Sequence, residues 1–186
     1  MQKSVYIIHG WEWSPESNWF PWLEKKLRDT GVEAKALAMP NPYHPTLSAW
    51  VESIATAVGE ADEETFLVGH SLGVIAILRY LETLPDSERI GGAVLVAGFP
   101  EPIGIDELGA FFETPLDYEI VRNVGRSFVA IQSDNDPYVP MKNGELLHDR
   151  LDAELVVIHD AGHLNASDGY SELPMVLEKL KEMMKP

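Results

Sequence analysis

Short apolar runs rich in β-branched residues alternate along the chain with longer stretches in which apolar side chains recur every three or four positions. Most of the short runs are continuously apolar, which is typical of parallel strands covered on both faces. They fall at Ser4–His9, Glu33–Leu37, Thr65–Val68, Gly92–Ala97, Ser127–Ser133 and Leu155–His159. The alternation predicts βαβ units and an α/β fold with a mostly parallel sheet of about six strands.

The amphipathic stretches between these runs predict helices on both faces of the sheet. They span Phe20–Thr30, Leu47–Gly59, Leu72–Leu84, Leu116–Asn123, Met141–Leu151 and Ser171–Met184. Pro21 suits a first helical turn, and Gly31 and Gly59 can end helices. Thr46 can cap the second helix, and Thr114-Pro115 has the pattern of a cap followed by a first-turn proline.

The segment Gly98–Pro115 is the longest irregular connection beyond the two loops near the N-terminus. Its glycines and prolines, together with Phe111 and Phe112, favour a minimal lid or a loop beside the substrate. A surface connector whose two aromatic residues are anchored in the core fits the same residues equally well.

The composition fits one compact domain spanning 1–186. A chain of 186 residues with 45% hydrophobic residues has the size and apolar content of one ordinary globular unit, and we see no internal repeat, low-complexity tract or linker. The chain has no cysteine, which excludes disulfides, thiolate metal sites, cysteine nucleophiles and iron–sulfur clusters.

The net charge of -16 disfavours nucleic acid and anionic membranes as partners. The N-terminal apolar run ends at Gly10, which is too short for a signal peptide, and it lacks a small-residue cleavage site. The longest apolar run, Gly91–Phe99, is far shorter than the ~20 residues that a membrane-spanning helix needs. We therefore expect a cytoplasmic protein, with a monomer as the default state.

The strongest chemical signal is the pentapeptide Gly69-His70-Ser71-Leu72-Gly73. This G-x-S-x-G pattern lies directly between an expected strand and an expected helix, where a sharp turn can hold a serine hydroxyl clear of the backbone. The flanking glycines suit such a turn because side chains there would collide with neighbouring elements. The context favours Ser71 as a nucleophile over an ordinary glycine-rich junction.

A serine nucleophile needs a histidine base. His163 follows a glycine turn after the last expected strand, so an imidazole there can reach back to the serine. The other histidines are placed less well, at positions 9, 44, 70, 148 and 159. A zinc site formed by His159 and His163 has helical ligand spacing, but this segment is a glycine-containing loop, so we expect no metal.

The carboxylate that orients the base is expected on the loop after Ser127–Ser133. Asp136 is favoured because the following Pro137 biases it toward an extended conformation at the loop tip. Asp134 remains an alternative, although it can instead bond backbone amides in a turn. Asp160 is a weaker third candidate.

Acyl transfer also needs two donors for the oxyanion. The backbone amide of Leu72 should supply one, and the amide of Trp11, in the loop after the first strand, should supply the other. Of the four tryptophans in the early segment, Trp19 and Trp22 suit core packing, whereas Trp11 and Trp13 flank the oxyanion loop. The residues expected to contact substrate are Gly10, Trp13, His70, Phe111 and Phe112.

Three motifs together resemble the α/β-hydrolase superfamily: Gly69–Gly73, Asp136–Pro140 and Gly162-His163. The chain length, the segment Asn18–Leu23 and the Met39-Pro40 loop look more narrowly like the small serine hydrolases of the YdeN and retinoblastoma-binding protein nine type. The resemblance covers nearly the whole chain. It implies a single-domain α/β-hydrolase fold with a reduced sheet and no large cap.

The same resemblance implies Ser71 as nucleophile, Asp136 as orienting acid and His163 as base. The serine mechanism itself needs no cofactor. The namesake of the family is linked to the retinoblastoma protein by a Leu-x-Cys-x-Glu motif, which a cysteine-free chain lacks. No protein partner is therefore inferred.

The leading hypothesis is a serine hydrolase that cleaves carboxylic ester, thioester or activated amide bonds of a small acyl substrate through an acyl-enzyme. The alternative from another class is a non-catalytic binding module that keeps the fold and docks a protein partner. An acyltransferase using the same acyl-enzyme is a third possibility. Acyl chains of short or medium length suit the small lid.

Overall fold

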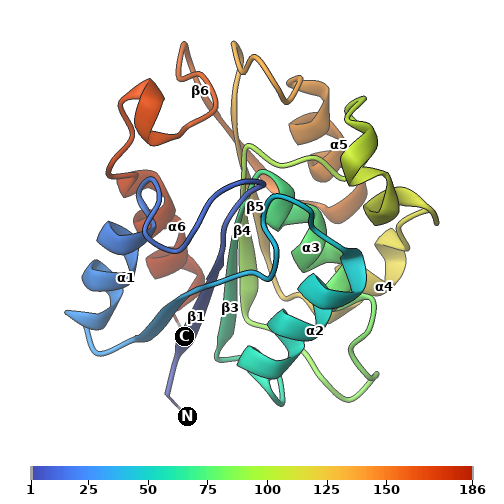
Figure 1. Cartoon of the computed structure of the whole chain (residues 1–186). Coiled ribbons are helices and arrows are strands. Elements are labelled where there is room, and N and C mark those ends of the chain that lie inside the picture. Colours follow the sequence, from blue (N-terminus) through green and yellow to red (C-terminus); the bar gives the residue numbers. More distant parts are fainter. Residues whose placement is uncertain (1, 186) are drawn as a thin grey trace.

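The computed structural model describes residues 2–185 and contains one six-stranded, fully parallel sheet (Figure 1). The strands are β1 (Ser4–Ile8), β2 (Glu33–Leu37), β3 (Thr65–His70), β4 (Gly92–Val96), β5 (Phe128–Ser133) and β6 (Glu154–Ile158). Their order across the sheet is β2-β1-β3-β4-β5-β6, which confirms the predicted parallel α/β architecture.

Six α-helices cover the sheet, as the amphipathic pattern predicts. They are α1 (Phe20–Arg28), α2 (Leu47–Val58), α3 (Leu72–Leu81), α4 (Tyr118–Val124), α5 (Lys142–Leu151) and α6 (Pro174–Met183). Two short 3-10 helices, η1 (Asp106–Phe112) and η2 (Ala166–Asp168), lie in the connections after β4 and β6. The long connection after β4 therefore carries a helical turn at its centre.

Successive side chains along each strand pack alternately into two separate hydrophobic cores, one on each face of the sheet. Leu67 of β3 packs with α2, α3, α4 and α5 on one face, whereas its neighbours Phe66 and Val68 pack with α1 and α6 on the other. Figure 1 shows α1 and α6 together on one side of the sheet and the remaining helices on the opposite side. Strands buried on both faces explain why the sequence runs are continuously apolar.

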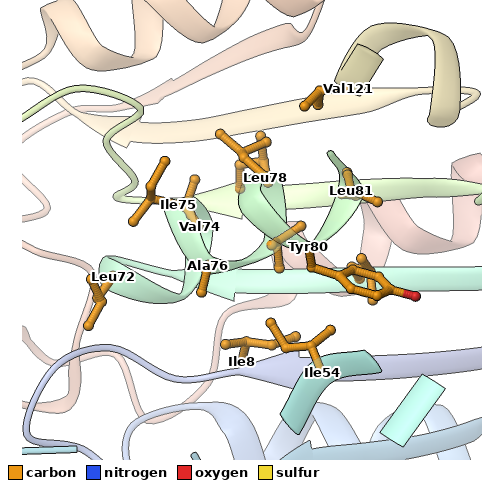
Figure 2. Close-up of a cluster of buried hydrophobic side chains, with 14 of the residues drawn as sticks. Ile8, Ile54, Leu72, Val74, Ile75, Ala76, Leu78, Tyr80, Leu81 and Val121 are labelled. Atoms are coloured by element: carbon orange, nitrogen blue, oxygen red, sulfur yellow. The ribbon is translucent and has the colours of Figure 1, made fainter. Parts of the chain in front are cut away.

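Helix α3 is the most deeply buried helix, with all ten of its residues inside the protein. Figure 2 shows its side chains surrounded by Ile8 of β1, Ile54 of α2 and Val121 of α4. Gly73 lets this helix approach β1, because a Cβ there would lie 2.2 Å from the Ile8 carbonyl oxygen. The close seating fixes the first turn of α3 against the sheet.

Two expected helix caps differ from those observed. Thr46 stands at the N-cap position of α2, but its side chain makes no capping hydrogen bond. The cap of α4 is Asp117 rather than Thr114, because the Asp117 carboxylate accepts hydrogen bonds from the Glu119 and Ile120 amides. The helix therefore begins after Pro115 and Leu116 instead of at them.

Replacing Gly73 by alanine should lower the free energy of unfolding by roughly 1–3 kcal/mol, the usual cost of overpacking a buried contact. Urea denaturation measures this change. Gly109→Ala is the matched control, because a Cβ at Gly109 meets nothing within 4 Å. Equal stability of the two variants would contradict the close seating of α3.

Candidate active site

Ser71 occupies a sharp turn between β3 and α3. Its backbone angles are φ 54° and ψ -119°, a left-handed conformation that is strained for a residue with a side chain. The Ser71 amide donates to the Val96 carbonyl at 2.9 Å, and the Ser71 carbonyl accepts from the Val74 amide at 3.0 Å. A Cβ on Gly69 would lie 2.9 Å from backbone atoms of Gly73 and Val74, so this position of the turn needs a glycine.

His163 lies in the loop after β6 and is held at three points. Its ring Nδ1 donates to Asp136 Oδ2 at 2.7 Å, and its backbone amide donates to Asp168 Oδ2, also at 2.7 Å. Its carbonyl oxygen accepts a hydrogen bond from His70 Nε2 at 2.9 Å. Only 5% of the His163 side chain is exposed, so the ring has little freedom to turn away.

The structure brings Asp136, not Asp134, to His163. The Asp136 side chain is fully buried, and its other oxygen, Oδ1, accepts from the Tyr138 and Val139 amides at 2.8 and 3.0 Å. These bonds hold the carboxylate in the orientation that faces the imidazole. Three hydrogen bonds therefore satisfy a buried charge that would otherwise be costly.

Asp134 instead pairs with His159 at the surface. Asp134 Oδ2 lies 2.5 Å from His159 Nδ1, and the His159 side chain is 81% exposed. The hydrogen bond to Asp134 raises the pKa of His159, and the same bond lowers the pKa of Asp134. The pair lies outside the cleft that Ser71 lines.

Side chains from the end of β5 and from the loop after it fasten the loop that carries His163. Three successive backbone amides of this later loop each donate to one of those side chains. These bonds are Asp160 N to Asp134 Oδ1 at 2.9 Å, Ala161 N to Ser133 Oγ at 3.0 Å and Gly162 N to Asn135 Oδ1 at 2.8 Å. The relative position of the candidate acid and base is thus fixed by several contacts besides their own.

Ser71 and His163 open onto a common cleft of about 430 Å³. One wall is apolar and comes from the connection after β4, which contributes Phe99, Ile103, Ile105 and Leu108. The remaining lining residues are Trp11, Glu12, Trp13, Tyr138, Asn165 and Ser167. The connection after β4 therefore borders the site, as one of its two sequence interpretations predicts.

The two expected oxyanion donors have free backbone amides. Between residues 2 and 185, neither the Trp11 amide nor the Leu72 amide donates a hydrogen bond to another protein group. Leu72 is the first residue of α3, where an unpaired amide is ordinary. A Cβ on Gly10 would lie 3.1 Å from the Ser71 Cβ, so the loop after β1 runs directly beside the serine.

Of the five residues expected to contact substrate, Trp13 lines the cleft, whereas Gly10, His70, Phe111 and Phe112 do not. His70 is fully buried because β3 extends through it and directs its side chain beneath Trp13, with ring centroids 4.6 Å apart. Phe111 is also fully buried and packs edge-on against Trp50, while the Phe112 ring packs against Phe99 with ring centroids 5.9 Å apart. We therefore correct the expectation for these four residues.

His70 has a different place in the site. Because a carbonyl oxygen can only accept, Nε2 is the protonated nitrogen of His70 and Nδ1 carries the lone pair. This Nδ1 atom is buried, and the structure gives it no hydrogen-bond partner among residues 2–185. Burial lowers the pKa of His70 well below its usual range, so the ring stays neutral beside His163.

Several residues of the site escaped the sequence interpretation. Ser133 and Asn135 carried a signal, since a polar run directly after an apolar strand marks the sheet edge where sites lie. Asp168 carried none, because its contact with the His163 amide depends on the path of η2. The apolar wall likewise depends on how the connection after β4 folds back.

Residues 2–185 contain no group of three or more histidine, aspartate or glutamate side chains arranged to hold a metal ion. None of their helices combines the length and the apolar character needed to cross a membrane.

The chain is similar to known proteins in sequence and in structure. The family model described as serine hydrolase matches residues 5–182. YdeN of Bacillus subtilis (strain 168) is 37% identical over 181 residues, covering 97% of this chain and 95% of YdeN. The serine hydrolase RBBP9 of Rattus norvegicus is 30% identical over 165 residues, covering 87% of this chain and 86% of RBBP9. The crystal structure of the ydeN gene product from B. subtilis superposes with a TM-score of 0.94 at 36% identity and covers 98% of each chain.

The parallel sheet and the strand–turn–helix at Ser71 define an α/β-hydrolase fold. The chain belongs to the serine hydrolase family that also includes YdeN and RBBP9. This membership confirms the resemblance noted in the sequence and makes the protein a hydrolase.

Replacing Asp134 by asparagine should lower the pKa of His159 toward the ordinary imidazole range, because the hydrogen bond to Asp134 is the main cause that raises it. An NMR titration of the imidazole protons measures the change. Asp160→Asn is the control and should lower the pKa less, because Asp160 acts only through its charge. The pairing would be contradicted if both variants left the titration unchanged.

Proposed function

We propose that the protein hydrolyses carboxylic ester, thioester or activated amide bonds of a small acyl substrate, with Ser71 as nucleophile, His163 as base and Asp136 as the orienting acid. The observation that carries the proposal is the convergence of Ser71 and His163 on one cleft while His163 Nδ1 bonds the buried Asp136 carboxylate. Family membership supports hydrolysis as the outcome.

The hydrogen bond to Asp136 places a proton on His163 Nδ1 and leaves Nε2 as the lone-pair nitrogen. In the first step, Ser71 Oγ attacks the substrate carbonyl carbon while Nε2 takes the hydroxyl proton. The tetrahedral oxyanion accepts hydrogen bonds from the free amides of Trp11 and Leu72. The C–O, C–S or C–N bond then breaks as His163 returns the proton to the leaving group.

The acyl group remains on Ser71 after the leaving group departs. A water molecule then gives its proton to His163 Nε2 and attacks the acyl carbonyl, passing through a second tetrahedral oxyanion. Collapse releases the carboxylic acid and returns the proton from His163 to Ser71. No cofactor enters this sequence, because the protein groups supply every proton transfer.

The shape of the cleft favours a small substrate with a short or medium acyl chain. The apolar wall formed by Phe99, Ile103, Ile105 and Leu108 suits the acyl chain, whereas Glu12, Asn165 and Ser167 offer polar contacts to another part of the substrate. A volume of about 430 Å³ lies toward the lower end of the range of small-molecule sites.

A fluorophosphonate probe should label Ser71 of the purified protein, because such probes react with activated serines. Ser71→Ala and His163→Ala should each abolish labelling, and Ser71→Ala should also abolish turnover of p-nitrophenyl butyrate. Mass spectrometry locates the adduct. A folded wild type that resists labelling, or a Ser71→Ala variant that keeps its turnover, would disprove the proposal.

Asp136→Asn should reduce kcat by about 10²–10⁴-fold, since an asparagine stabilises neither the reactive tautomer nor the imidazolium of His163. Steady-state hydrolysis of the same ester measures the effect. Asp134→Asn is the matched control from the same loop and should leave kcat close to that of the wild type. The assignment of the acid would be overturned if Asp134→Asn caused the larger loss.

A further inference from the structure

His9 is a buried histidine that the reaction scheme above leaves without a role. It follows the last residue of β1 and is only 2% exposed. Its ring Nδ1 lies 2.8 Å from the Gly10 carbonyl oxygen, and its Nε2 lies 3.1 Å from the Met39 amide nitrogen. Both ring nitrogens therefore have backbone partners, one on the loop after β1 and one on the loop after β2.

These partners determine which nitrogen carries the proton. The Met39 amide can only donate, so His9 Nε2 accepts, and the Gly10 carbonyl can only accept, so His9 Nδ1–H donates. Burial lowers the pKa of His9, which agrees with a neutral ring that has one donor and one acceptor. The ring consequently acts as a fixed link between the two loops.

The bond to Gly10 orients the peptide unit that follows it. The carbonyl of Gly10 and the amide of Trp11 belong to the same planar trans peptide, so they point in opposite directions. When the Gly10 carbonyl is held toward the buried His9 ring, the Trp11 N–H is directed away from that ring. This is the amide assigned above to the oxyanion.

We propose that His9 is a positioning residue for the oxyanion site: its Nδ1–H holds the Gly10–Trp11 peptide in the orientation that presents the Trp11 amide to the substrate carbonyl. The inference rests on the proposed function, since it names what orients one donor of that site. It assigns no contact between His9 and substrate.

The loop after β2 also holds neighbouring groups of the loop that carries this peptide. Besides the Met39 amide, the Pro42 carbonyl accepts from the Glu12 amide at 2.9 Å, and the Tyr43 carbonyl accepts from the Trp11 indole at 3.4 Å. The Trp50 indole packs edge-on against His9 and donates to the Pro40 carbonyl at 2.8 Å. The segment from Met39 to Tyr43 thus fixes the oxyanion loop at both ends.

A matched pair of substitutions separates positioning from packing. The amide nitrogen of asparagine lies where His9 Nδ1 lies, so His9→Asn can keep the bond to Gly10 but loses the acceptor for Met39. The longer side chain of His9→Gln can keep the acceptor for Met39 but loses the donor at the δ position. Each variant retains one of the two hydrogen bonds, so the pair should lose similar amounts of thermal stability.

We expect His9→Gln to lower kcat for p-nitrophenyl butyrate by at least about tenfold with little change in KM, because removing an oxyanion donor outright costs about 10²–10³-fold. His9→Asn should retain most of the wild-type kcat. Equal losses in the two variants, or the larger loss in His9→Asn, would overturn the inference. Circular dichroism melting of both variants shows whether stability explains any difference.

A measurement on the wild type keeps the test independent of how the variants fold. A long-range ¹H–¹⁵N NMR correlation of the His9 ring should show a protonated Nδ1 and an unprotonated Nε2, and the reverse tautomer would overturn the inference. Fluorophosphonate labelling separates the two proposals. If the wild type is labelled at Ser71 while the His9 variants contradict the pattern above, only the inference fails. If the wild type resists labelling, the proposed function fails and the inference falls with it.

Discussion

The architecture depends on how closely α3 sits against the sheet. Gly69, Gly73 and Gly98 leave no room for a Cβ, with the nearest atoms 2.9, 2.2 and 2.4 Å away, and this lets the first turn of α3 pack closely against β1 and the segment after β4. The fully buried helix leaves Ser71 no relaxed alternative, so its strained backbone persists. The other candidate groups reach the serine from loops after β1, β5 and β6, which meet at the carboxyl edge of the sheet.

Much of the fold and of the candidate site could be predicted from sequence, because the patterns that indicate them lie within short segments of the chain. Continuously apolar strands and the turn at Ser71 depend on near neighbours, and parallel topology puts the loops that carry Asp136 and His163 at the same edge of the sheet. The choice between Asp136 and Asp134 stayed open because both lie on one loop. In the structure the Tyr138 and Val139 amides bond one oxygen of the Asp136 carboxylate, and the other oxygen faces His163, whereas Asp134 pairs with His159.

The side-chain positions that the sequence did not predict, those of His70 and Phe111, are determined by tertiary packing. His70 was expected to contact substrate. In the structure β3 continues past Val68, where the strand was expected to end, and the alternation of side chains places His70 on the α1 face. Phe111 packs inward because η1 folds back over Trp50, a contact between segments distant in sequence. Such placements follow from tertiary packing, which a pattern along one chain does not encode.

Three hydrogen bonds between the end of β5 with its following loop and the loop after β6 run in one direction, from backbone amides to side-chain oxygens. Ser133, Asp134 and Asn135 supply side-chain acceptors, whereas Asp160, Ala161 and Gly162 supply only backbone amides. Every amino acid except proline has a backbone N–H, so this hydrogen bond allows position 160 to change to almost any residue during evolution. These hydrogen bonds therefore constrain the amino-acid identities in the segment at the end of β5, but only the backbone path of the loop after β6. Within the family, the two sides of this contact should differ in how fast their residues change.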